Sequence, residues 1–144
     1  MARMLFDHDH FHEFAARYTA AWCSHDPNRV AAFFAHEGSL SINGGAPAFG
    51  RAAIAEAARA YMTAFPDLLL ALDRILVQQG CVEYHWTLTG TNTGPGGTGK
   101  RIHISGHEIW HLGADELITT SLGYYDAAEY RRQLEQGYQD PASA

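Results

Sequence analysis

The chain has 144 residues, of which 47% are hydrophobic and 18% charged, and this fits one globular domain able to bury about two-thirds of its unfolded surface. Its formal net charge of -6 leaves no basic face to meet phosphates, which argues against nucleic acid or an anionic membrane as the main partner. The two cysteines are too few for a disulfide framework, and no apolar run has the length of a signal peptide or a membrane span. We therefore expect a single cytoplasmic domain over residues 1–144.

Helical patterns dominate the first half of the chain. Apolar residues recur at spacings of three and four over residues 12–24 and again over 51–65, where Pro66 stops the pattern. Between these two helices, Asp26-Pro27 supplies an N-cap and a first-turn proline. This pair predicts a short helix that continues to Phe34.

The second half of the chain alternates with a period of two. We expect strands over residues 68–78, 82–91, 101–112 and 117–124, with a shorter one over 39–43. Asp126 should then begin a C-terminal helix. Helices followed by strands with short turns indicate an α+β domain, a cone formed by a curved antiparallel sheet with helices on its concave face.

One face of the strand over residues 101–112 is apolar except for Glu108. Side chains two apart share a face of a strand; here these are Ile102, Ile104, Gly106, Glu108, Trp110 and Leu112. A carboxylate in such a place needs a partner, a proton or a wet cavity. Glu108 therefore either lies in an aromatic pocket that raises its pKa, or pairs with an arginine or a tyrosine hydroxyl and has no chemical role.

Aromatic residues are numerous enough to line such a pocket and to fill a core as well. We predict that one set contacts a flat apolar ligand, although much of it also fits a packed core. The set comprises Tyr18, Trp22, Phe33, Tyr61, Phe65, Trp86 and Trp110.

Several short motifs together resemble the SnoaL-like polyketide cyclases of the nuclear transport factor 2-like (NTF2-like) superfamily. They are Phe65-Pro66-Asp67, Gly90-Thr91-Asn92-Thr93-Gly94, Ile104-Ser105-Gly106, and Asp126 followed by Arg132-Gln133-Leu134. The resemblance covers nearly the whole chain. It implies a cone-shaped half-barrel of the ketosteroid isomerase-like fold, a homodimer through the sheet, and ring closure by aldol chemistry without a cofactor.

The resemblance also implies where an acid/base group would stand. In the family, an aspartate near the end of the last strand moves the proton, and a histidine on the preceding strand assists. Here Gly123 occupies the aspartate position and Glu108 the histidine position, while His36 matches a second pocket histidine. His36 also fits a structural role at the end of the short helix, where the helix dipole favours a cationic ring.

These observations support two hypotheses from different classes. The first is a cofactor-independent cyclase, isomerase or dehydratase for a small apolar carbonyl compound, with Glu108 and His36 as candidate catalytic residues. The second is a non-catalytic ligand-binding or assembly domain, because the acid/base position is Gly123. A third, epoxide hydrolysis, requires an Asp-Arg-Asp cluster, of which Asp73-Arg74 supplies only part.

Three further patterns have structural interpretations. His103, His107 and His111 share a strand face, but residues four apart on a strand are roughly 13 Å apart, so we predict no metal site there. Asp126 and Glu129 form a capping-box pattern, which favours a helix cap over a base. Residues 68–72 are apolar on both faces, which is typical of a strand whose outer side a second subunit covers.

Overall fold

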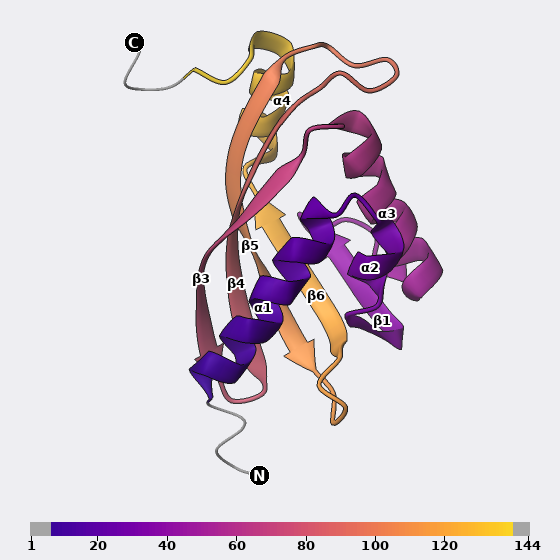
Figure 1. Ribbon diagram of the computed structural model, residues 1–144, viewed down its shortest axis with the longest axis vertical. Helices are drawn as coiled ribbons and strands as arrows, with labels where there is room; N and C mark the ends of the chain where they lie inside the picture. The colour runs from indigo at the N-terminus through magenta and orange to yellow at the C-terminus, as the bar shows by residue number, and fades with distance from the viewer. Residues whose placement is uncertain (1–6, 140–144) are drawn as a thin grey trace.

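The computed structural model describes residues 7–139, which form one curved sheet with helices against it (Figure 1). In chain order the elements are α1 (His8–Cys23), α2 (Pro27–Ala31), β1 (Phe34–Ile42), β2 (Ala48–Phe49), α3 (Arg51–Ala64), β3 (Leu69–Gln78), β4 (Cys81–Thr91), β5 (Arg101–Leu112), β6 (Ile118–Tyr125) and α4 (Ala127–Gln136). The predicted α+β class and curved, open sheet are confirmed. None of the helices in this described part of the chain is long and apolar enough to cross a membrane.

The strands lie in the order β2-β1-β6-β5-β4-β3. Neighbouring strands are antiparallel except β1 and β6, which run parallel. The sheet is therefore mixed, whereas the sequence predicted an antiparallel one. β5 lies in the interior of the sheet, between β4 and β6. Its inner face therefore points into the hollow of the curved sheet.

The predicted end of the second helix was wrong. The helix stops at Ala31, and β1 begins at Phe34 instead of residue 39. Ile118 N donates to Phe33 O at 2.9 Å, so pairing with β6 replaces the local helical pattern. His36 consequently lies within β1 and not at the end of a helix.

Aromatic rings fill one part of the hollow. Trp110 stacks on Tyr84 with ring centroids 4.7 Å apart, and Tyr18 of α1 meets Trp110 edge-on at 5.0 Å. Phe14 contacts the same indole edge-on at 5.6 Å. Such edge-to-face and stacked contacts stabilise a core beyond the burial of area. These packed rings also surround the neighbouring residue Glu108 on one side.

The motifs around Asp67 and Asn92 hold the end of α3 against the end of β4. The Asp67 carboxylate accepts hydrogen bonds from Thr91 N at 2.7 Å and Thr91 Oγ1 at 2.8 Å. Asn92 Nδ2 donates to Ala64 O at 3.1 Å. These family-typical residues therefore have a structural role in this chain.

The C-terminal helix is attached to β5 by one buried side chain. Gln133 Oε1 accepts from His103 N at 2.7 Å, and Gln133 Nε2 donates to His103 O at 3.1 Å. The pairing of β6 with β5 begins only at Gly106, so Gln133 takes the place of a strand neighbour beside His103. The predicted Asp126 cap is confirmed, because its carboxylate accepts from Glu129 N at 3.0 Å.

Candidate functional site

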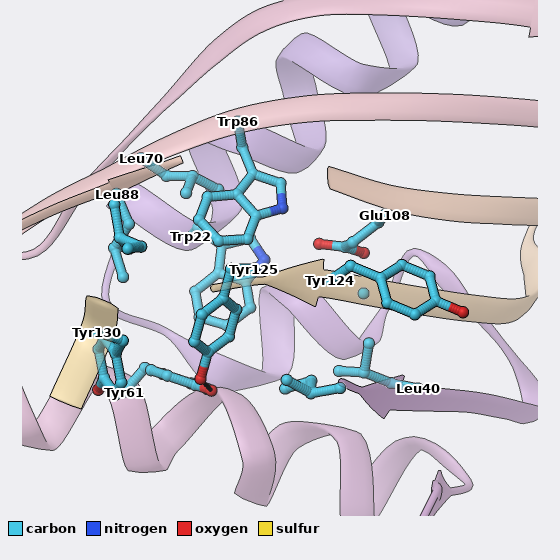
Figure 2. A pocket seen from close by; sticks show the side chains of 13 residues that line it. Trp22, Leu40, Tyr61, Leu70, Trp86, Leu88, Glu108, Tyr124, Tyr125 and Tyr130 are labelled. Atoms are coloured by element: carbon cyan, nitrogen blue, oxygen red, sulfur yellow. Dashed lines mark hydrogen bonds between the residues drawn. The ribbon is translucent and has the colours of Figure 1, made fainter. Parts of the chain in front are cut away.

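A cavity opens on the concave side of the sheet (Figure 2). It holds about 580 Å³ of empty space, counted out to its open mouth. Its described lining residues come from every long element: Trp22, Leu40, Ile42, Tyr61, Leu70, Trp86, Leu88, Ile104, Glu108, Gly123, Tyr124, Tyr125 and Tyr130. Glu108 alone among these carries a carboxyl group, so the cavity presents one carboxylate in a mostly apolar wall.

The alternation of β5 places Glu108 on the inner face, as the strand pattern predicts. Its side chain is 8% exposed, and in the register of the sheet it faces Tyr84 of β4 and Gly123 of β6. The next inward residue along β5 is Trp110, which belongs to the aromatic core. Glu108 therefore lies at the boundary between the packed rings and the open cavity.

The two carboxylate oxygens of Glu108 have different surroundings. Oε1 accepts three hydrogen bonds, from Ser121 Oγ at 2.7 Å, Trp110 Nε1 at 2.9 Å and Tyr18 Oη at 3.0 Å. Oε2 has only a longer contact with the same Tyr18 hydroxyl, at 3.2 Å. Within residues 7–139 the Glu108 carboxylate forms no ion pair. Neutral donors thus hold one oxygen and leave the other less engaged.

Burial raises the pKa of the Glu108 carboxyl above its ordinary value. The hydrogen bonds from Trp110, Ser121 and Tyr18 lower this pKa but do not cancel the rise. The sequence suggested that Glu108 could pair with an arginine or a tyrosine hydroxyl. The structure shows the tyrosine hydroxyl, that of Tyr18, and no arginine of residues 7–139 pairs with Glu108. A carboxyl held in this way is a stronger base than an exposed glutamate.

Gly123 leaves room beside Glu108. A Cβ at this position would stand 3.6 Å from Glu108 Cγ and 3.5 Å from Ser41 O, both ordinary contact distances. The position at which the resemblance expects the family's aspartate is thus directly across from Glu108 on the adjacent strand. The carboxylate of Glu108 enters the same region from β5.

Two tryptophans of the cavity wall have unpaired N–H groups. Trp22 Nε1 and Trp86 Nε1 are buried and have no hydrogen-bond partner within the part of the chain that the structure describes. The six-membered ring of Trp86 lies over Gly106, where a Cβ would come 2.5 Å from Trp86 Cζ2. Figure 2 shows both indole nitrogens on the edges turned toward the Glu108 side of the cavity.

Three tyrosines form a second polar point of the cavity. The hydroxyls of Tyr61 and Tyr125 are 3.1 Å apart and share one hydrogen bond. Burial raises the pKa of Tyr61, and it raises the pKa of Tyr130 to about 12. The hydroxyls of Tyr61 and Tyr130 are therefore protonated near neutral pH and can donate hydrogen bonds.

The predicted ligand-contacting residues divide into three groups. Trp22, Tyr61 and Trp86 line the cavity together with Glu108. Tyr18 and Trp110 do not line it but hydrogen-bond to the Glu108 carboxylate. The structure brings these six residues to one region from α1, α3, β4 and β5.

The remaining predicted residues lie elsewhere. Phe33 contacts the rings of Phe14 and Tyr18, and Phe65 is fully buried against Tyr130. His36 is exposed on β1 and is not among the residues that line the cavity.

Sequence reasoning missed several residues of the site. On the inner face of β6, Tyr125 lies two positions after Gly123 and lines the cavity, and Ser121 lies two positions before it and donates to Glu108. The period of two along this strand indicated both residues. Leu40 and Ile42 lie in the strand expected over residues 39–43, but the sequence did not indicate that this strand borders the cavity.

Comparison with known proteins identifies the same fold. A model of the SnoaL-like domain family matches residues 15–121. The structure of TsrD from Streptomyces laurentii superposes with a TM-score of 0.76 at 21% identity, covering 89% of this chain and 96% of that one. A search of curated proteins gave no match.

Two other solved structures are similar. One is a hypothetical protein with a ketosteroid isomerase-like fold from Catenulispora acidiphila, crystallised with trimethylamine; its TM-score is 0.73 at 18% identity, over 83% of this chain and 90% of that one. The other is SalBIII, an epoxide hydrolase/cyclase-like enzyme with a role in pyran ring formation in the polyether salinomycin. It has a TM-score of 0.73 at 18% identity, over 85% of this chain and 95% of that one. At these identities the likeness concerns the fold.

Proposed function

The chain belongs to the SnoaL-like domain family, and we propose that it is a cofactor-independent proton-transfer enzyme for a small, largely apolar carbonyl compound. One observation carries this proposal. Glu108 is a buried carboxylate whose pKa is raised, with one oxygen held by three donors and the other less engaged, at the wall of an apolar cavity.

In the proposed reaction, Glu108 Oε2 removes a proton from the carbon next to the substrate carbonyl. The electron pair of the broken C–H bond moves into an enolate, and Glu108 becomes a neutral acid. That acid then returns the proton to the same carbon, to a conjugated carbon, or to the alkoxide formed when the enolate attacks a second carbonyl. These outcomes correspond to exchange, isomerisation and aldol cyclisation, and none requires a redox partner.

The surroundings of Glu108 suit this role. Ser121, Trp110 and Tyr18 all donate to Oε1, so the carboxyl plane is held while Oε2 takes and returns the proton. A raised pKa brings the conjugate acid nearer to neutral pH, where proton transfer in both directions is efficient. The apolar wall limits competition from water.

The proposal is tested by proton exchange with 2-tetralone, a bicyclic ketone with acidic C–H bonds next to its carbonyl. NMR in heavy water measures the rate of deuterium incorporation with the protein present. We expect the protein to accelerate exchange and Glu108→Gln to abolish the acceleration. Glu83→Gln is the matched control, because Glu83 lies on the outer face of the neighbouring strand, across from Ile109. Equal acceleration by Glu108→Gln and the unchanged protein would refute the role of Glu108.

A non-catalytic ligand-binding domain is the second candidate. It is favoured by Gly123 at the family's acid/base position and by His36, which is exposed on β1 away from the cavity lining. The same experiment separates the two candidates. Saturable binding of 2-tetralone without any acceleration of exchange would favour the binding domain.

A further inference from the structure

Two buried donors in the cavity wall have no use in the proton transfer described above. Trp22 and Trp86 are 9% and 8% exposed, and their indole N–H groups are unpaired within residues 7–139. An indole N–H donates and cannot accept, so only an acceptor atom satisfies it. Because an unpaired buried donor destabilises the folded state, two such donors in one cavity wall point to a ligand that supplies the acceptor.

The other polar atoms show that this feature is specific to the cavity. The third tryptophan, Trp110, donates its N–H to Glu108 at 2.9 Å. The remaining unpaired buried side-chain atom of the described residues, His85 Nε2, is 3.5 Å from Glu83 Oε2 and lies on the outer face of the sheet. The unpaired indoles are thus the two that line the cavity.

Packing restricts both indoles from turning toward solvent. The ring of Trp86 lies over Gly106, and the ring of Trp22 meets Tyr61 edge-on at 6.3 Å. Burial raises the pKa of Tyr18, and the Trp22 N–H near its hydroxyl opposes that rise as a donor, although the two groups fall short of hydrogen-bond geometry. Both nitrogens are turned toward the side of the cavity that holds Glu108 (Figure 2).

We propose that the indole N–H groups of Trp22 and Trp86 bind one acceptor oxygen of the ligand, and that the ligand is a neutral cyclic or aromatic ketone. An ammonium ligand has no acceptor and would leave both donors unpaired, and a carboxylate ligand would be repelled by Glu108. In the ketone, the oxygen meets the indoles and the adjacent C–H meets Glu108 Oε2. The placement of the C–H rests on the proposed function, whereas the binding of the oxygen does not.

Such an arrangement would also act on the reaction. Two N–H donors directed at the carbonyl oxygen stabilise the negative charge that develops there when the enolate forms. The exposed His36 is then not needed to polarise the oxygen.

The experiment compares 2-tetralone with tetralin, which has the same ring system but no oxygen. In ¹H–¹⁵N spectra of the whole protein, we expect 2-tetralone to move the indole N–H signals of Trp22 and Trp86 downfield. The signal of Trp110, which already donates to Glu108, should move little. Tetralin should produce no downfield shift. The single Trp→Phe variants assign the three signals.

Affinity provides the second measurement. Trp22→Phe and Trp86→Phe each remove one N–H, and each should weaken 2-tetralone by about two- to tenfold relative to tetralin in the same variant. Using this ratio removes the effect of the smaller Phe ring, which weakens both compounds alike. An unchanged ratio, or no binding of 2-tetralone up to its solubility limit, would overturn the proposal.

The two proposals fail separately. A ratio of 2-tetralone to tetralin affinity that neither tryptophan substitution changes, together with retained Glu108-dependent exchange, would refute the indole site alone. A ketone preference that depends on both tryptophans, together with no accelerated exchange, would refute the proton transfer alone.

Discussion

Two carboxylates show how strongly local surroundings determine acidity in this chain. Asp67 is exposed, and hydrogen bonds from the backbone and side chain of Thr91 lower its pKa. Glu108 accepts hydrogen bonds from more donors but is buried, and burial raises its pKa despite them. The difference arises because water stabilises one charge and is excluded from the other. A hydrogen-bond count alone would have ranked the two groups wrongly.

The raised pKa of Glu108 predicts a pH-dependent cost of folding. Because the folded pKa lies above the unfolded value, the stability from this group is fully present below the ordinary glutamate pKa of about 4.3 and is lost as the pH rises through the raised value. Glu108→Gln keeps the shape but cannot ionise. We expect its thermal unfolding temperature, relative to the unchanged protein, to increase as the pH rises from 4 to 8.

Comparing the two proteins at each pH cancels the titration of all other groups. Glu83→Gln provides a control for the removal of a carboxylate on the neighbouring strand. A difference in unfolding temperature that stays constant with pH would contradict a raised pKa for Glu108.

At the scale of elements, the sequence predicted correctly those helices and strands whose bounds depend on neighbouring residues in the chain. The alternation of side chains along β5 correctly predicted Glu108 on its inner face. The spacing of Asp126 and Glu129 correctly predicted the N-cap of α4. β1 was misjudged because its start depends on pairing with β6, more than eighty residues away in the chain. Leu40 and Ile42 lie in the part of β1 that was expected as a strand, but only this long-range pairing shows that they border the cavity.

The attachment of α4 to β5 illustrates a contact that a local pattern could not reveal. Gln133 is 2% exposed and satisfies both backbone groups of His103. The spacing of residues in a helix does not indicate that a glutamine will hydrogen-bond to a strand in place of a neighbouring strand. Only the structure shows that β5 extends past β6 at this point.

We predict that Gln133→Leu destabilises the protein by about 1–3 kcal/mol, because it leaves the N–H and C=O of His103 without partners. Urea unfolding measures the loss, and amide hydrogen exchange at His103 should become faster. Gln136→Leu is the control, since Gln136 is exposed on the same helix. Equal stability of the two variants would show that the bonds of Gln133 contribute nothing measurable.

At the scale of the whole molecule, the sheet has two dissimilar faces. The concave face carries the aromatic core and the cavity, while the outer face carries a group of apolar side chains among polar ones. We define this outer patch as Leu76, Ile109, Leu122 and the ring of Tyr124, which contacts the ring of His107 on this face although Tyr124 also borders the cavity. Tyr124 and Leu76 are 39% and 42% exposed, and apolar side chains gathered on one exposed face are typical of an interaction surface.

We predict that the outer patch pairs with a second copy of the chain, as the family resemblance implies. Analytical ultracentrifugation should show a dimer, and Ile109→Lys should shift it toward monomer by placing a charge in the patch. Phe49→Lys is the control, because Phe49 is 66% exposed on the edge strand β2, at the far end of the sheet from β3. A monomer at micromolar concentrations before any substitution would contradict the prediction.

The space beside Gly123 has a consequence for how such proteins diverge. Position 123 on β6 lies across from Glu108 on β5, and a Cβ there would stand at ordinary contact distance from Glu108 Cγ. Two carboxylates so close together would repel each other, which favours one of them alone. If Glu108 is the base, as we propose, a carboxylate on either strand could serve the same cavity. A missing aspartate in an aligned column is therefore poor grounds for declaring a member of this lineage inert.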